Sequence, residues 1–275
     1  MSEEQRKMLV ALDISDITEI VIENAGTYAK ILDLPIEFLH IENNKSQKQE
    51  ALTKLTELAK NVNEKYGILP EITIKEGNIY TSISDYANQT RPILVMMGTH
   101  GLTGMQKIFG SKALKVIVGS SIPFWIVQDK PKNVELKNII FPIDFTFESK
   151  EKLTIVKYLS HYFKFKVNIV TPNLKDQILR SKIKNNLIHV DKALTERELE
   201  YEIIIGADKG DMADAVTKVA ESINADIIVI TTTKHIAWND YMFGAPEQRV
   251  IPNAAKIPVI CVNPRTDLTK FASFR

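Results

Sequence analysis

The sequence predicts two tandem α/β domains, each built around a five-stranded parallel sheet. Two observations lead to this fold class. Short motifs occur twice in the same order, and apolar runs typical of buried strands alternate with segments of helical periodicity. The repeated motifs are "MLVALDIS" (8–15) with "IIFPIDFT" (139–146), "PILVMMG" (92–98) with "DIIVITT" (226–232), "IFGSKALKVI" (108–117) with "MFGAPEQRVI" (242–251), and "SIPFWIVQ" (121–128) with "KIPVICVN" (256–263).

The offset between the copies changes only slightly along the chain. It is 144 − 13 = 131 at Asp13, 244 − 110 = 134 at Gly110 and 258 − 123 = 135 at Pro123. A tandem duplication with small insertions explains this drift. We therefore assign a first domain to residues 1–130, a linker to residues 131–136 and a second domain to residues 137–268.

In the first copy, strands and helices alternate regularly. The nearly continuous apolar run at 8–13 is typical of a parallel strand covered on both faces. The strands are expected at 8–13, 36–43, 71–77, 92–98 and 123–128, with helices at 17–33, 46–67, 79–90 and 110–120. Gly67 is a typical helix stop. The second copy repeats the order less clearly, and its segment 174–198 is expected to contain a helix of undefined limits.

The composition excludes several classes of protein. Among 275 residues, 35 Lys and Arg balance 34 Asp and Glu, which argues against a general nucleic-acid binder and against adsorption to an anionic membrane. No apolar run is long enough for a transmembrane helix, and the charged N-terminus does not resemble a secretion signal. A single cysteine, Cys261 within the apolar "IPVICVNP", is expected to be a buried, inert thiol. We expect a cytoplasmic protein.

One glycine-rich loop follows the fourth strand of the first copy. Gly98, Gly101 and Gly104 can expose backbone amides, while Gly110 and Ser111 lie at the start of the next helix, where amides and a hydroxyl can hold an anion. This pattern fits a phosphate cradle, although tight turns alone also explain such glycines. It is neither a P-loop, because the Gly-Lys-Ser/Thr ending is missing, nor the usual dinucleotide fingerprint.

Together, "GTHGLTGMQKIFGS", "VALDIS", "FLHIEN" and "IPFWIVQ" resemble the universal stress protein family over nearly the whole chain. The resemblance implies a tandem universal stress protein with Rossmann-like, adenine nucleotide alpha hydrolase-like domains. It implies a site for ATP or ADP, with Mg as a further candidate. The site residues that it implies, together with the loop histidine, are Asp13, Ile41, Met97, Gly98, His100, Gly101, Gly110 and Ser111. Eight residues separate Gly101 from Gly110, one fewer than in the family's ATP-binding pattern.

The resemblance places Asp13 near the adenine or ribose, Ile41 at the adenine edge through its backbone, and Met97 at the base of the pocket. A turn or helix-cap role explains Asp13 equally well, because "DISD" offers several caps. In the second copy, Thr232 stands where the first has Gly98, and His235 where it has Gly101. A β-branched residue resists positive φ. We therefore expect the second copy not to bind ATP in the same way.

Three functions remain open. The first is a nucleotide-binding stress or signalling protein without robust catalysis, because no general base is evident. The second is an interaction or scaffold protein of the same family that has lost the nucleotide, and the third is a slow ATPase. No metal site and no catalytic residues are predicted. The final strands of the two copies, 123–128 and 258–263, are expected to pair antiparallel as an intramolecular pseudo-dimer, and a homodimer of whole chains stays possible.

Overall fold

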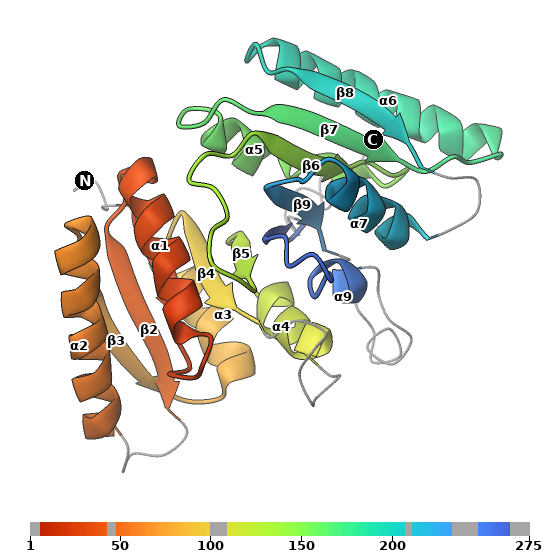
Figure 1. Cartoon of the computed structure of the whole chain (residues 1–275). Helices are drawn as coiled ribbons and strands as arrows, with labels where there is room; N and C mark the ends of the chain where they lie inside the picture. Colours follow the sequence, from red (N-terminus) through yellow and green to blue (C-terminus); the bar gives the residue numbers. More distant parts are fainter. Residues whose placement is uncertain (1–5, 43–47, 100–108, 207–210, 233–246, 265–275) are drawn as a thin grey trace, which may run out of the picture.

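The computed structural model describes residues 6–42, 48–99, 109–206, 211–232 and 247–264. The first half contains, in order, β1 (Met8–Ala11), α1 (Thr18–Leu32), β2 (Ile36–Glu42), α2 (Lys48–Tyr66), β3 (Glu71–Glu76), α3 (Ile79–Thr90), β4 (Leu94–Gly98), α4 (Phe109–Val118) and β5 (Phe124–Val127). Figure 1 shows this half in red to yellow-green, at the lower left.

The second half repeats this order with one extra short helix. It contains β6 (Asn138–Pro142), the 3₁₀ helix η2 (Phe147–Lys150), α5 (Leu153–Leu159), β7 (Lys166–Thr171), α6 (Gln177–Thr195), β8 (Tyr201–Ile205), α7 (Met212–Ser222), β9 (Ile227–Thr231), α9 (Glu247–Val250) and β10 (Val259–Val262). The segment 174–198, whose helix limits the sequence left open, contains α6. Asp176 caps α6, because its carboxylate accepts a hydrogen bond from the Leu179 amide.

Within the described residues, the ten strands form one sheet in the order β3-β2-β1-β4-β5-β10-β9-β6-β7-β8. All strand pairs inside each half are parallel. The predicted fold class, two tandem five-stranded parallel α/β units, is therefore confirmed. The domain limits and the linker at 131–136 stay predictions, with β5 ending at Val127 and β6 beginning at Asn138.

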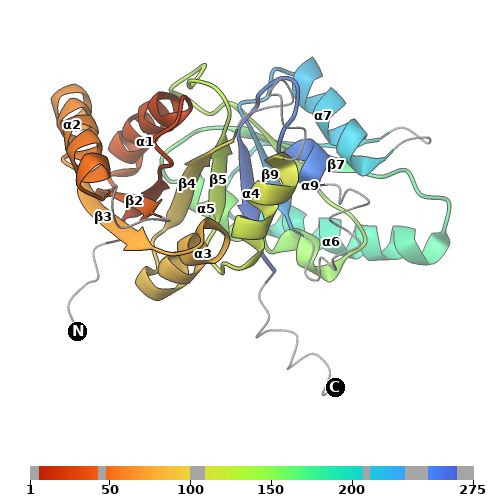
Figure 2. The same ribbon diagram turned by 90° about the horizontal axis from the view of Figure 1, so that it is seen from below.

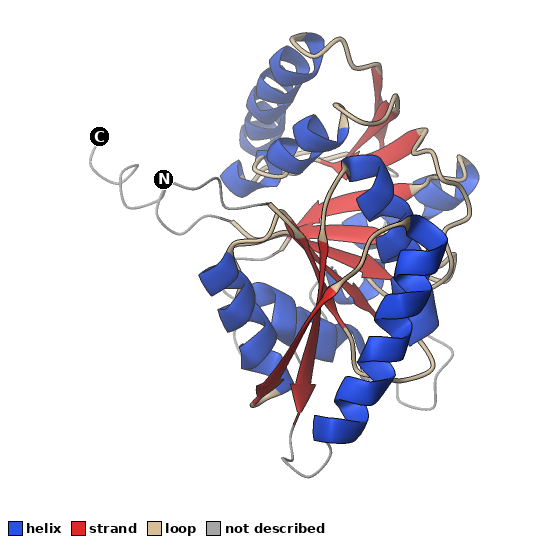
Figure 3. Cartoon of the chain, turned by 90° about the vertical axis from the view of Figure 1, so that its left-hand side faces the viewer, coloured by secondary structure: helices blue, strands red, loops and turns tan. Residues whose placement is uncertain are grey.

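Helices cover both faces of this sheet, as Figures 2 and 3 show from two further directions. Residues of α1, α2, α5 and α6 belong to one buried cluster, and those of α3, α4, α7 and α9 to the other. Burial on both faces explains why β1 and β5 are apolar at every position. None of the described helices is long and apolar enough to span a membrane.

The two halves are joined by the antiparallel pairing of β5 and β10. Val259 lies opposite Ile126, Ile260 opposite Trp125, and Cys261 opposite Phe124, all fully or almost fully buried. This confirms the predicted pairing of the final strands and the buried position of Cys261. The pairing covers two apolar edges that would otherwise be open to aggregation.

A buried carboxylate stabilises the first half on the side of the sheet away from β5, at β2 and β3. Glu37 of β2 is 2% exposed, accepts hydrogen bonds from Thr73 (2.6 Å) and Tyr86 (2.5 Å), and lies 2.7 Å from the Lys7 ammonium. Burial alone would raise the pKa of Glu37, but these three donors outweigh it and lower the pKa below its ordinary value of 4.5. The ionised carboxylate therefore stabilises the fold at neutral pH.

We expect Glu37→Gln to lower the free energy of unfolding by about 2–4 kcal/mol at pH 7, because it leaves Lys7 without its buried partner. The folded-state pKa is depressed, so this difference is present above pH 4.5 and shrinks as the pH falls through the folded-state pKa. Urea unfolding at several pH values measures it. Glu71→Gln is the control, since Glu71 is 76% exposed and 3.6 Å from Lys7. Equal effects of both substitutions would contradict the assignment.

Candidate functional site

A cavity of about 420 Å³ lies at the carboxyl ends of β1 and β2, where parallel α/β sheets commonly bind ligands. It extends around the strand ends toward the first turns of α2 and α3. Its lining residues are Asp13, Ile14, His40, Ile41, Glu42, Glu50, Ala51, Lys54 and Ile79. The structure thus brings two of the sequence-predicted site residues, Asp13 and Ile41, to one cavity.

Strand β2 extends further than β1, and this leaves the Ile41 backbone open. The last β1–β2 pair is Ala11 with Leu39, and the Leu12 amide still donates to the Leu39 carbonyl (2.9 Å). Backbone groups alternate in direction along a strand, so the N–H and C=O of Ile41 also point to the β1 side, beyond its end. Within the described chain, neither group forms a hydrogen bond on that side. One donor and one acceptor are therefore available at the cavity.

Asp13 forms a turn at the cavity mouth. Its Oδ1 accepts hydrogen bonds from the Ser15 amide (3.2 Å) and hydroxyl (2.6 Å). It does not cap α1, which begins after Ile17 without a side-chain cap. The turn role considered from the sequence is therefore present. Asp13 is exposed and lines the cavity, so a contact of its other oxygen with a ligand stays a prediction.

Two buried polar residues that the sequence analysis did not assign to the site also line the cavity. The His40 Nδ1 lies 2.8 Å from the Leu12 carbonyl, which can only accept, so Nδ1 carries a proton. The His40 Nε2 lies 3.3 Å from Glu42 Oε2. Both residues are 8% exposed. Their position on either side of Ile41, in "LHIE", was the available signal.

Met97 and Gly98 end β4, the neighbour of β1. Met97 is half-buried and packs against the α3–α4 side of the core, but it is not among the residues that line the cavity. A Cβ at Gly98 would lie 2.7 Å from Val21 and 2.8 Å from Ile17, so glycine is needed here for the packing of α1. The next amide, of Thr99, donates to the Val127 carbonyl. Ligand contacts of Met97 and Gly98 stay predictions.

The remaining predicted site residues are not placed against this cavity. His100 and Gly101 lie outside the described residues. The backbone of Gly110 and Ser111 belongs to the first turn of α4, which begins at Phe109, but their side chains are not described. Among the residues that the structure describes, no group of three or more His, Cys, Asp or Glu could hold a metal ion.

The first half of the chain is similar in sequence to known proteins. Residues 4–128 match the model of the universal stress protein family. The first half of the chain is thus similar to universal stress proteins. A universal stress protein of Methanocaldococcus jannaschii is 27% identical over 147 residues, which cover 46% of this chain and 84% of that protein.

Two solved structures extend the similarity in fold to both halves of the chain. The first, a universal stress protein from Archaeoglobus fulgidus, has a TM-score of 0.78 and 19% identity, with 96% of this chain and 98% of that chain covered. The second is a putative universal stress protein from Pseudomonas aeruginosa, with a TM-score of 0.68, 14% identity and 98% of both chains covered. At these identities, the similarity shows the tandem fold alone.

Hydrogen bonding in the sheet gives the true correspondence between the two domains. The Thr99 amide donates to Val127, and the Thr232 amide donates in the same way to Val262. Gly98 pairs with Val127 as Thr231 pairs with Val262. The counterpart of Gly98 is therefore Thr231. The sequence alignment, which assigned Thr232, was wrong by one residue, because the inserted residues fall in the loops.

The counterpart of Ile41 is Pro172. The Leu12 amide donates to Leu39, and the Ile143 amide donates to Val170, an offset of 131 on both strands. This offset takes Ile41 to Pro172, which has no N–H. The second domain therefore lacks the backbone donor that Ile41 provides in the first. The proline in "VNIVTPN" was the sequence signal for this difference.

The second domain has a buried lysine at the position where the first has Val21. At the same offset, Val21 corresponds to Lys152, a residue only 2% exposed. Its ammonium donates to the Ser149 carbonyl and lies 3.5 Å from the Thr231 hydroxyl and 4.6 Å from the centre of the Phe141 ring. Gly98 and Val21 of the first domain are thus replaced by two side chains that contact each other.

An asparagine of α6 contacts the turn that follows β6. The Asn186 amide nitrogen donates to the carbonyls of Asp144 (2.9 Å) and Thr146 (2.7 Å). Asp144 repeats the turn of Asp13, since its Oδ1 accepts from the Thr146 amide and hydroxyl. These bonds hold α6 against the turn that follows β6. At the same offset, Asn186 corresponds to Leu55, which is buried in the core and does not line the cavity of the first domain.

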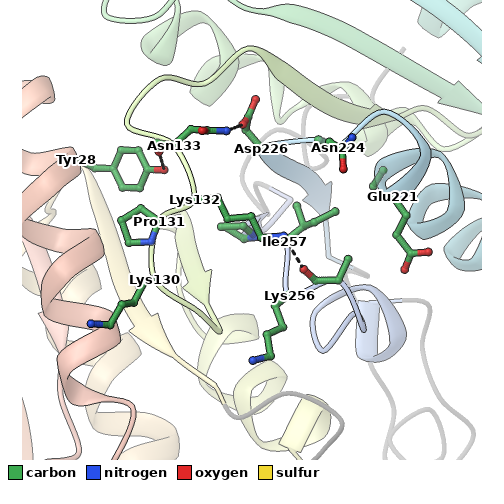
Figure 4. A pocket seen from close by; sticks show the side chains of 14 residues that line it. Tyr28, Lys130, Pro131, Lys132, Asn133, Glu221, Asn224, Asp226, Lys256 and Ile257 are labelled. Carbon is green, nitrogen blue, oxygen red and sulfur yellow. Dashed lines mark hydrogen bonds between the residues drawn. The ribbon is translucent and has the colours of Figure 1, made fainter.

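A second cleft, of about 230 Å³, lies between the two halves (Figure 4). Tyr28 of α1 lines one side, and Asp226 lies before β9 on the other. The Asp226 carboxylate accepts hydrogen bonds from the amides of Lys137 (2.7 Å) and Asn138 (2.9 Å) and from the Asn133 side chain (3.2 Å). Burial, reinforced by the Asp226 charge, raises the pKa of Tyr28 to about 12. The hydrogen bonds of Asp226 hold the segment between β5 and β6 against the second domain.

We expect Lys152→Met to raise the free energy of unfolding by about 1–4 kcal/mol at pH 7, because it removes a buried charge and keeps the side-chain volume. Burial lowers the pKa of Lys152 from 10.5 to about 7, despite the Asp144 carboxylate. In wild type, the unfolded chain binds the extra proton between these values, so wild-type stability rises there with pH. The gain in Lys152→Met should be largest at or below pH 7 and smaller toward pH 10.

Urea unfolding of both proteins across this pH range measures the difference. Lys182→Met is the matched control, since Lys182 is exposed on α6 and its loss should change stability by less than about 0.5 kcal/mol. A loss of stability in Lys152→Met would show that the hydrogen bonds of the ammonium outweigh its desolvation.

Proposed function

We propose that the first domain binds ATP or ADP at the carboxyl ends of β1 and β2, and that the second domain does not bind nucleotide in the same way. The observation that carries this proposal is the open backbone N–H and C=O of Ile41 at a cavity of about 420 Å³. An adenine edge offers one acceptor and one donor, which such a pair can match. The similarity of residues 4–128 to the universal stress protein family supports the same ligand class.

In this proposal, each predicted site residue has a defined part. Ile41 reads the adenine edge, Asp13 meets the adenine or the ribose, and Met97 supports the base. The phosphates, with Mg as a candidate counter-ion, fall to the loop residues Gly98, His100, Gly101, Gly110 and Ser111. Amides at the N-terminus of α4 favour anions, which agrees with this direction of the nucleotide.

Binding would then regulate the protein in a cytoplasmic stress response or signalling role, and robust catalysis is not part of the proposal. Pro172 supports this division of roles, because it has no N–H at the position of Ile41 in the second domain. The alternative function is that of a scaffold protein that has lost nucleotide binding. It requires an intact fold without affinity for adenine nucleotides.

We expect Ile41→Pro, which copies the proline of the second domain, to weaken ATP binding about tenfold, since it removes one hydrogen-bond donor. Ile41→Val is the matched control, because it keeps the N–H and the branched side chain, and its affinity should stay within about twofold. Calorimetric titration measures both, and circular dichroism verifies that the variants fold. Equal affinity of the two variants would contradict the role of the Ile41 amide.

The wild-type titration separates nucleotide binding from the scaffold alternative. Folded protein that shows no heat of binding at millimolar ATP or ADP overturns the proposal. The phosphate loop is tested by Gly101→Val and Ser111→Ala, which should each weaken ATP more than adenosine. Affinities for ATP that do not change in either variant would remove the loop from the site.

A single-turnover assay tests the absence of robust catalysis. With protein in excess over labelled ATP, we expect phosphate release at the rate measured in buffer, because Asp13, His40 and Glu42 lie at the proposed adenine end of the site rather than at the phosphates. Release that is faster than in buffer, and that is lost in Asp13→Asn, would instead assign a slow ATPase.

A further inference from the structure

The edge strand β8 exposes apolar side chains at the outer end of the second domain. It is the last strand in the sheet order, so the described chain provides it with a neighbour, β7, on one side only. Figure 1 shows it at the top of the molecule. Ile203 is 49% exposed and Ile205 is 66% exposed. An apolar edge strand of this kind favours pairing with another chain.

The equivalent edge of the first domain is protected. In β3, Ile72 and Ile74 pack against the core. The pairs Phe38–Ile72 and Ile169–Ile203 show that Ile72 and Ile203 are equivalent. The β3 sequence "EITIKE" is charged at both ends, whereas β8 reads "YEIII". Charged residues at an edge discourage pairing, so the open apolar edge is specific to the second domain.

The hydrogen bonds to β7 show which backbone groups of β8 point outward. The Val167 amide donates to the Glu200 carbonyl (2.8 Å), and the Gly206 amide donates to the Thr171 carbonyl (2.7 Å). Even-numbered residues of β8 therefore face β7. Because the direction alternates along a strand, the N–H and C=O of Tyr201, Ile203 and Ile205 point to the open side.

We propose that β8 pairs antiparallel with β8 of a second copy of this chain, with Ile203 on the twofold axis. This register joins Ile203 to Ile203 of the partner subunit and Tyr201 to Ile205 of the partner subunit. It uses all three outward-facing residues of each strand, and a shift in either direction loses a pair. The contact is isologous, as expected of a closed dimer.

The charges of β8 are compatible with this register. The Glu202 carboxylate lies 2.6 Å from the Lys166 ammonium of the same chain, so its charge is already paired. Across the axis it meets Ile204 of the partner subunit rather than another carboxylate. The net charge of the chain is +1, so long-range repulsion between two copies is weak. A second copy therefore fits the edge without a charge conflict.

Light scattering after gel filtration tests the proposal on the full chain. We expect the wild type to have twice the chain mass of 31.1 kDa at high micromolar concentration, and Ile203→Lys to be monomeric. Ile188→Lys is the matched control, since Ile188 is 57% exposed on α6 rather than on the edge strand, and it should stay dimeric. A monomeric wild type, or a dimer that Ile203→Lys leaves intact, overturns the proposal.

Cysteine substitution tests the register. Directly opposite residues have Cβ atoms about 4.5–5.5 Å apart, close enough for a disulfide to form after slight adjustment. Mild oxidation should therefore link Ile203→Cys into a covalent dimer. Glu202→Cys should not be linked, because position 202 is offset from its own copy. The wild type is the blank, since its Cys261 is fully buried. Equal linking at both positions contradicts the register.

Discussion

The antiparallel pairing of β5 with β10 is the interaction on which the rest of the structure depends. Each half is a parallel sheet whose last strand is apolar at nearly every position and has one side open. Joining these two sides covers both edges and produces one sheet of ten described strands. It also relates the halves by a pseudo-twofold axis. The two domains can therefore be compared residue by residue at equivalent positions.

Several differences between the domains lie near the carboxyl ends of equivalent strands. Ile41 becomes Pro172, so a backbone donor is lost. Gly98 is replaced by Thr231, and Val21 by Lys152. These two replacements are in contact, because the Thr231 hydroxyl lies 3.5 Å from the Lys152 ammonium. The duplicated fold has thus kept its core and β-sheet pairing. The first domain keeps a backbone N–H at Ile41, and the second has a proline there.

The two outer edges of the sheet have diverged as well. In β3, charged ends and packed isoleucines protect the strand, whereas Ile203 and Ile205 of β8 are exposed. The domain that has Pro172 in place of Ile41 is therefore also the domain with the open edge. This distribution is consistent with nucleotide binding in one domain and association through the other. The predicted roles rest on separate observations, so each can stand without the other.

The sequence by itself determined the repeat, the order of strands and helices, and the antiparallel joint, because apolar periodicity and repeated motifs record burial directly. It also indicated Asp13 and Ile41, which follow strands whose ends must meet at one edge of a parallel sheet. Only the tertiary structure decided that Thr231, rather than Thr232, replaces Gly98, since register is defined by hydrogen bonds between distant strands. The same holds for the contact of Lys152 with Thr231, a residue 79 positions away.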